Sequence, residues 1–182
     1  MTSKPTFQTA SFFKTSTMNI LSTFCNAIQS VNITLIETLL RKFPNLANAK
    51  DQRGFTPLVY ATYFDKIEIA ETLIKHNANV NHRDVKGNTA LLGVAFKGNV
   101  DIAALLLKND ANINTQNNIG YSAIIFATLY NKPKMVEFLI KNNADISLTD
   151  KANKSALDYA KENRFNEIIA LLQSKSTYLQ TT

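Results

Sequence analysis

The side chains that could perform catalysis or hold a metal are few in this chain. Its 182 residues include two histidines, His76 and His82, and a single cysteine, Cys25. The histidines are not spaced as a metal-binding pair on one helix face, and no glycine-rich phosphate-binding loop occurs. One cysteine forms neither an intramolecular disulfide nor a cysteine-based metal cluster. We therefore expect no enzyme activity, no cofactor and no metal, and we expect Cys25 to be a small buried apolar residue.

The aspartates that recur along the chain have a structural explanation. Asp51, Asp84 and Asp150 occupy the same position of a 33-residue period. The residue three positions after each aspartate is a glycine or, after Asp150, Asn153. Aspartate side chains accept hydrogen bonds from nearby backbone amides in turns, and glycine or asparagine tolerates positive φ. The pattern predicts a tight turn in an extended, finger-like segment, with positive φ at Gly87 and Gly120.

The 33-residue period organises most of the chain, and self-similarity at a fixed period marks a stacked repeat protein. Three full repeats occupy residues 51–83, 84–116 and 117–149. Degenerate repeats at 18–50 and 150–173 are expected to cap the stack, because terminal repeats face solvent on one side. We expect residues 1–17 to be a disordered leader that folding does not need, and residues 174–182 to be a frayed tail.

Each full repeat reads as two short amphipathic helices. A hydroxyl residue precedes the first helix and can cap it: Thr56, Thr89 and Ser122. The second helix is predicted to end at a residue suited to a left-handed C-cap: Asn77, Asp110 and Asn143. In the first full repeat the second helix is expected to bury Ile67, Ile69, Ala70, Leu73 and Ile74.

Charge and hydropathy narrow the classes of partner. The net charge is +6, but no block of the chain is strongly one-signed; residues 84–149, for example, carry six basic and five acidic side chains. No continuous basic stripe would track phosphates, so we expect no nucleic acid partner. The chain also lacks the run of about 18 apolar residues that a membrane helix needs. A cytoplasmic, monomeric protein without membrane contact is expected.

The period, the turn glycine, the TPL motif at Thr56 and the exit sequence NANVN after His76 resemble the ankyrin repeat family. The resemblance covers residues 18–173. It implies an all-α solenoid of helix-turn-helix units joined by β-hairpin-like fingers. The family has a histidine directly after TPL, which usually bonds between repeats. Here that position holds Val59, Leu92, Ile125 and Asp158, so this hydrogen-bond network is in doubt.

The resemblance also implies a function, which is binding another protein without catalysis, through a concave surface of fingers and first helices. Transferred by repeat position, the candidate protein-binding residues are Gln52, Arg53, Phe55, Tyr63, Phe64, Lys86, Asn88, Phe96, Lys97, Ile119, Tyr121, Leu129 and Tyr130. The same positions include Val85, Asn118, Lys151, Ala152 and Lys154. A self-assembling structural scaffold and a nucleic-acid-associated protein are the alternatives.

Six of these candidates are aromatic: Phe55, Tyr63, Phe64, Phe96, Tyr121 and Tyr130. Leucine, isoleucine and alanine positions already supply the core, so these rings are expected on the surface, as in binding hot spots. The alternative is that Tyr63 and Phe96 pack sideways between first helices. Phe64 has no ring at the equivalent position of the next repeat, Lys97, and is expected to be the least structural of the six.

Overall fold

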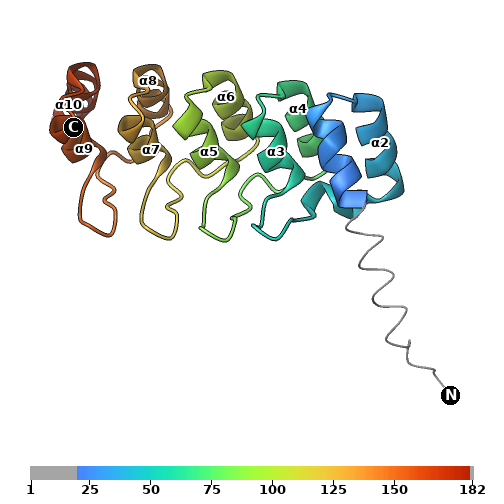
Figure 1. Ribbon diagram of the computed structural model, residues 1–182. Helices are drawn as coiled ribbons and strands as arrows, with labels where there is room; N and C mark the ends of the chain where they lie inside the picture. Colours follow the sequence, from blue (N-terminus) through green and yellow to red (C-terminus); the bar gives the residue numbers. More distant parts are fainter. Residues whose placement is uncertain (1–19, 181–182) are drawn as a thin grey trace. The chain divides into compact units, whose positions relative to one another are not determined.

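The computed structural model describes the backbone of residues 20–180 and the side chains of residues 20–174 (Figure 1). The predicted leader, residues 1–17, lies outside this range. The chain divides into two compact units, with the boundary between Ala78 and Asn79. The described residues form ten α-helices, one 3₁₀ helix and no named strand, which confirms the predicted all-α repeat fold.

The first unit begins with a helix over residues 20–29. Val31, with φ of 56°, reverses the chain, and helix α2 follows at Ile33–Lys42. The 3₁₀ helix η1, Pro44–Asn48, begins at the proline that was expected to stop α2. The full repeat then supplies α3, Pro57–Tyr63, and α4, Ile67–Lys75, with α3 packed against both α4 and η1.

The second unit holds three helix pairs. These are α5 (Ala90–Lys97) with α6 (Val100–Lys108), α7 (Ala123–Leu129) with α8 (Pro133–Lys141), and α9 (Ala156–Glu162) with α10 (Asn166–Gln180). Helices α5, α7 and α9 pack side by side, and α6, α8 and α10 form a second row (Figure 1). Helix α10 continues to Gln180, past the boundary at residue 173 that the repeat period predicts.

The core of each unit consists mainly of aliphatic side chains from both helices of the repeats, and the first unit also buries Phe24. The first helices bury the leucine, isoleucine and alanine positions expected of them, including Leu58, Leu91 and Ile124. Leu92 and Ile125, which replace the family's histidine, are also buried. Of the five α4 residues expected in the core, Ile69, Ala70 and Leu73 are buried, and Ile74 is half-buried. Ile67 is 37% exposed, because it is the first residue of α4, where a side chain lies over the turn rather than over the neighbouring helix.

Each finger is a tight turn closed by two backbone hydrogen bonds. In the finger at residues 84–88, the Gly87 N–H donates to the Asp84 carbonyl, and the Asp84 N–H donates to the Asn88 carbonyl, both at 2.9 Å. Gly87 and Gly120 have φ of 79° and 89°, as predicted, and Asn153 takes the same conformation at 59°. Thr149 and Ser155 add an isolated antiparallel bridge in the last finger. The fingers are therefore hairpin-like turns rather than paired strands.

The predicted helix caps are confirmed at all but one position. Thr56 and Thr89 accept hydrogen bonds from the N–H groups of Val59 and Leu92, both at 3.4 Å. Ser122 accepts none, and its buried hydroxyl has no hydrogen-bond partner among the described residues, so this expected cap is wrong. The predicted C-cap residues Asn77, Asp110 and Asn143 all have positive φ, as expected.

Candidate functional site

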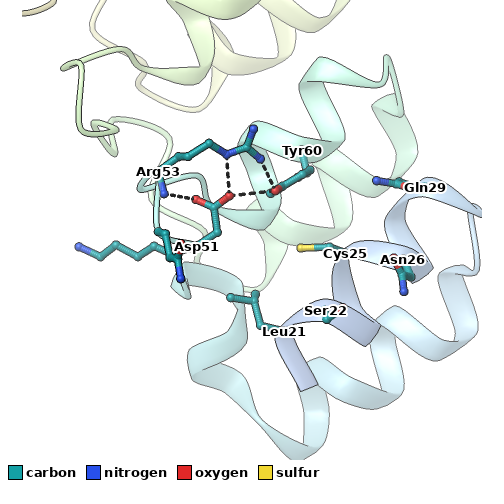
Figure 2. Close-up of a pocket in the computed structure, with 10 residues that line it drawn as sticks. Leu21, Ser22, Cys25, Asn26, Gln29, Asp51, Arg53 and Tyr60 are labelled. Carbon is teal, nitrogen blue, oxygen red and sulfur yellow. Dashed lines mark hydrogen bonds and ion pairs between the residues drawn. The ribbon is translucent and has the colours of Figure 1, made fainter. Parts of the chain in front are cut away.

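In the first unit, the candidate residue Arg53 forms a hydrogen-bonded cluster with Asp51 and Tyr60 (Figure 2). The Asp51 carboxylate accepts hydrogen bonds from the N–H groups of Arg53 and Phe55, at 2.8 and 2.9 Å. It also accepts from the Tyr60 hydroxyl at 3.0 Å and from Arg53 Nε at 3.1 Å. The Arg53 Nη2 group donates to the Tyr60 oxygen at 2.7 Å, which closes the triangle. We call Asp51, Arg53 and Tyr60 the Arg53 cluster.

The electrostatics of the Arg53 cluster fix its charges at neutral pH. Partial burial raises the pKa of Asp51, but the hydrogen bonds from Phe55, Tyr60 and Arg53 outweigh it and leave this pKa below its ordinary value. Burial, followed by the hydrogen bond to Asp51, raises the pKa of Tyr60. The cluster therefore contains a carboxylate, a guanidinium and a neutral phenol, and none of them is prepared to transfer a proton near pH 7.

Two hollows of the first unit meet at Arg53. A cleft of about 660 Å³ lies between the helix at residues 20–29 and the finger at residues 50–53, with Tyr60 on its wall (Figure 2). A second hollow of about 390 Å³ is mainly apolar and is lined by Phe55, Val59, Tyr60, Tyr63 and Phe64 together with Arg53 and Gln29. The first unit therefore has a polar cleft and an aromatic hollow that share Gln29, Arg53 and Tyr60 in their linings.

Cys25 lies on the wall of the polar cleft and is only half-buried, so the expectation of full burial is wrong. Burial and the nearby Asp51 carboxylate raise the pKa of its thiol to about 11. A thiol with this pKa is protonated at neutral pH and is a poor nucleophile. Its contribution to the cleft is that of a small, weakly polar surface.

The second unit gathers its rings into one continuous series, which we call the aromatic row: Phe96, Tyr130, Phe126, Tyr121 and Tyr159. Centroid distances between successive rings are 4.2, 6.3, 5.3 and 6.0 Å. Phe126 and Tyr159 were not predicted as site residues. Phe126 and Tyr159 lie two and three repeat periods after Tyr60. Aligning the repeats by their period would therefore have indicated Tyr60, Phe126 and Tyr159 as equivalent positions.

The six predicted rings lie outside the buried core, as expected. Tyr63, Tyr130 and Phe96 are the most exposed, at 59%, 49% and 38%. Phe96 does pack against Tyr130, a ring of the neighbouring first helix, which agrees in part with the sideways-packing alternative. Phe64 is half-buried and contacts both Tyr60 and Tyr63, so it is not the least structural of the set.

The fingers of the second unit are joined to one another through their backbones. The Asn118 N–H donates to the Lys86 carbonyl at 3.0 Å, and the Lys151 N–H donates to the Ile119 carbonyl at 3.1 Å. This pairing leaves the side chains of Val85 and Ile119 at the finger tips, 65% and 52% exposed. The tips thus present apolar side chains to solvent on a rigid backbone.

The predicted site residues fall into two groups, one in each unit. Around the Arg53 cluster lie Gln52, Arg53, Phe55, Tyr63 and Phe64. On the fingers and first helices of the second unit lie Lys86, Asn88, Phe96, Lys97, Ile119, Tyr121, Leu129 and Tyr130. Asn88 is half-buried and its side chain bonds to Asp84 and Asn117, so it serves the finger joint.

Metal ligation, the histidine contacts and membrane helices can be assessed in the part of the chain that the structure describes. Within it, no group of three or more His, Cys, Asp and Glu side chains could hold a metal ion. The Nδ1 atom of His76 lies 2.8 Å from the Thr72 carbonyl oxygen, a local contact within its own helix. None of the described helices is long and apolar enough to cross a membrane.

Comparison with known proteins agrees with the repeat geometry. The family model for ankyrin repeats (3 copies) matches the chain over residues 24–117 and again over residues 94–181. The chain belongs to the ankyrin repeat family. Ankyrin repeats are generally protein–protein interaction modules and are typically non-enzymatic. No curated protein sequence matches the chain.

Proposed function

We propose that this ankyrin repeat protein is a non-enzymatic adaptor that binds a partner protein through its fingers and first helices. The observation that carries the proposal is the exposed pair Phe96 and Tyr130, whose ring centroids lie 4.2 Å apart. The aliphatic core is complete without them, so folding does not account for their exposure. Exposed aromatic side chains at the centre of a rigid surface are typical of binding hot spots.

The finger tips extend the same surface. Val85 and Ile119 stand on a backbone that is already hydrogen-bonded from finger to finger. A partner that covers them buries apolar area without paying for loop ordering, since the loops are fixed before binding. We further propose that the protein acts as a monomer in the cytoplasm, with the surface free for a different protein rather than a second copy.

The experiment compares affinity capture by three forms of the full chain, read out by quantitative mass spectrometry. The test variant carries Tyr63→Ala and Tyr130→Ala, which removes one strongly exposed ring from each unit. The control carries Lys108→Ala and Lys141→Ala at the ends of the second helices α6 and α8. We expect the test variant to lose the captured protein with a nearly unchanged melting temperature, and the control to retain it.

Two results would contradict this proposal. Equal capture by the test variant would place the binding surface elsewhere. A loss of stability of several kcal/mol, as cavity formation in a core produces, would make these rings structural. Light scattering after size-exclusion chromatography separates the adaptor from the self-assembling scaffold, which predicts a mass above that of one 20.3 kDa chain.

A further inference from the structure

The finger of the first unit lacks a hydrogen bond that the last two fingers make. In the second unit, Asn118 and Lys151, the second residues of the last two fingers, donate their N–H groups to the preceding finger. The N–H of Val85, in the finger at residues 84–88, makes no such bond among the described residues. Gln52 occupies the same register position. Within residues 20–180, its N–H donates no hydrogen bond, and the residue lines the polar cleft instead.

The first repeat has a helix where the period predicts a finger. By the 33-residue period, the finger that should precede residues 51–55 falls at residues 18–22. Residues 20–29 are helical, so Leu21 and Ser22 present side chains to the cleft where a finger would present an extended backbone. An extended chain is the shape that would satisfy the Gln52 N–H.

Arg53 is oriented but still available for a ligand. Its Nε and Nη2 groups bond to Asp51 and Tyr60, and its Cζ atom lies 4.4 Å from the centroid of the Phe55 ring. Its side chain nevertheless remains 61% exposed. A guanidinium has five N–H donors, so the Nη1 pair stays available to an acceptor. Holding the group in one orientation before binding lowers the entropic cost of recognition.

The charges around the cleft select the sign of the ligand. Lys50 and Arg53 are cationic, and Asp51 is the one acidic residue on the cleft lining, where four donors already satisfy it. The remaining polar lining consists of neutral side chains, namely Ser22, Asn26, Gln29, Gln52 and Tyr60, with the thiol of Cys25. A carboxylate matches this balance, because Arg binds carboxylates through two parallel hydrogen bonds.

We propose that this edge binds an extended segment of a partner protein that carries a carboxylate beside an apolar side chain. The carboxylate bonds to Arg53, a backbone carbonyl of the segment accepts from the Gln52 N–H, and the apolar side chain enters the hollow lined by Phe55 and Tyr63. The source of the carboxylate is an Asp or Glu side chain or the partner's own C-terminus. The inference rests on the proposed protein-binding function and names the partner's chemistry.

The test is an NMR titration of the full chain with three peptide probes. These are acetyl-Ser-Phe-Glu-Ser-amide, the same peptide with Gln in place of Glu, and acetyl-Ser-Gln-Phe with a free C-terminus. We expect a peptide with a carboxylate to bind about tenfold more tightly than the Gln peptide, as one charge-assisted hydrogen bond allows. The Gln52 amide and Arg53 Nε–H signals should shift. The better of the two carboxylate peptides identifies a side chain or a C-terminus as the source.

Variants assign the effect to one side chain. Arg53→Gln should abolish the preference for the carboxylate, and Arg53→Lys should restore only part of it, because Lys keeps the charge without the planar pair of donors. The matched control is Arg41→Gln, which removes another exposed arginine of the same unit that also pairs with a carboxylate, Glu37. It should bind as the wild type does.

The proposal is overturned if all three peptides bind equally, if none binds, or if Arg53→Gln keeps the preference. Contacts in the peptide-free protein between the Gln52 amide and residues 1–17 would assign the cleft to the chain's own N-terminal segment and also overturn it. If the peptides fail while the Tyr63→Ala and Tyr130→Ala variant still loses its captured protein, the adaptor function stands and only the acidic-segment inference is wrong.

Discussion

Asp51 in the first unit and Asp150 in the second occupy the same position of the repeat and make nearly the same local bonds. Each carboxylate accepts from two backbone N–H groups and from a tyrosine hydroxyl nine residues later, Tyr60 or Tyr159. Their surroundings differ. Asp51 also bonds to an exposed arginine and faces a cleft, whereas Asp150 is buried, with 7% exposure, beside the preceding finger.

The difference shows how one turn motif serves two purposes. Around Asp150, the Tyr121 ring contacts Tyr159, and the Lys151 N–H bonds to the Ile119 carbonyl, so the motif joins two repeats. Around Asp51, the finger's equivalent N–H at Gln52 remains open to the cleft. The same hydrogen bonds that lock a joint in the second unit orient a guanidinium for a ligand in the first.

The strongest way to break the closed joint is to crowd it at Gly120. A Cβ there would lie 2.7 Å from the Cα atom of Asp150, and φ is +89°, which a β-branched residue does not tolerate. We expect Gly120→Val to lower the free energy of unfolding by roughly 2–4 kcal/mol, from strain and overpacking together. Denaturant unfolding measures this. Gly87→Val, whose Cβ would lie 2.9 Å from the Asn118 backbone nitrogen, should cost roughly 1–3 kcal/mol.

Gly93 supplies the control for these substitutions. It lies inside α5 with nothing within 4 Å of an added Cβ. Gly93→Ala should therefore stabilise the protein by roughly 0.5–1 kcal/mol, because alanine loses less conformational entropy in a helix. A Gly120→Val protein that unfolds at the wild-type denaturant midpoint would show that the finger joint does not hold the second unit together.

Removing the tyrosine hydroxyl compares the two motifs directly. Tyr159→Phe leaves a buried carboxylate without one of its donors, and we expect a cost of about 1.5–3 kcal/mol. Tyr60→Phe should cost about 0.5–1 kcal/mol, since Arg53 still donates to the more accessible Asp51 and water can replace the lost hydroxyl. Both variants keep the rings and their packing. Equal costs, measured by urea unfolding, would mean that the two clusters contribute alike to stability.

The pH dependence of stability also distinguishes Asp150 from Asp51. Burial raises the pKa of Asp150, but hydrogen bonds from Tyr159 and the amides of Lys154 and Ala152 outweigh it, and its folded pKa is lowered. A lowered folded pKa means that the stabilisation is complete above the unfolded value of about 4 and is lost as the pH falls through the folded value. Asp150→Asn should thus be less stable than wild type at pH 7 and approach it as the pH falls through the lowered folded pKa of Asp150.

Asp51→Asn is the comparison for the acid experiment. Its carboxylate also has a lowered pKa, so the sign of the effect is the same. The gap from wild type at pH 7 should be smaller, because Asp51 is the more accessible of the two and solvent weakens its interactions. Unfolding curves at a series of pH values measure both gaps. A gap that grows as the pH falls would contradict the assignment for either residue.

The fold was predictable because the same local sequence signals recur in each repeat. The turn glycines, the cap threonines and the left-handed C-caps each follow from one residue type at one register position, and the structure has them there. Ser122 fails as a cap although its residue type is suitable, because hydroxyl orientation depends on packing that the pattern does not encode. Local chemistry was therefore a good guide to backbone conformation and a weaker one to individual side-chain bonds.

The candidate site was predictable only in part. Aligning the repeats by their period assigned Arg53 and the exposed rings to finger and first-helix positions. It did not show that Tyr60 bonds to both Asp51 and Arg53, because these contacts join residues nine and seven positions apart across a turn. The cleft was also missed, since it arises from a helix at residues 20–29 where the period predicts a finger. A departure from the repeat, rather than the repeat itself, creates the most individual feature of the chain.

The smallest expected effect is that of Arg53→Gln on stability. This variant tests most directly whether the motif at Asp51 differs from the motif at Asp150. Arg53 bonds to Asp51 from a side chain that is 61% exposed, and exposed ion pairs contribute little to folding. Two backbone amides and Tyr60 still hold Asp51 after the substitution. We expect the melting temperature to change by no more than about 2 °C, as it should in Arg41→Gln.

The measurement is calorimetry of both arginine variants beside wild type, at low and at high salt. An exposed pair is screened, so any small loss in Arg53→Gln should shrink as the ionic strength rises. If Arg53→Gln instead melts many degrees lower while Arg41→Gln does not, the guanidinium is a structural part of the first unit. Its orientation would then serve folding, as Tyr159 serves the joint at Asp150, and the contrast between an open and a closed motif would be lost.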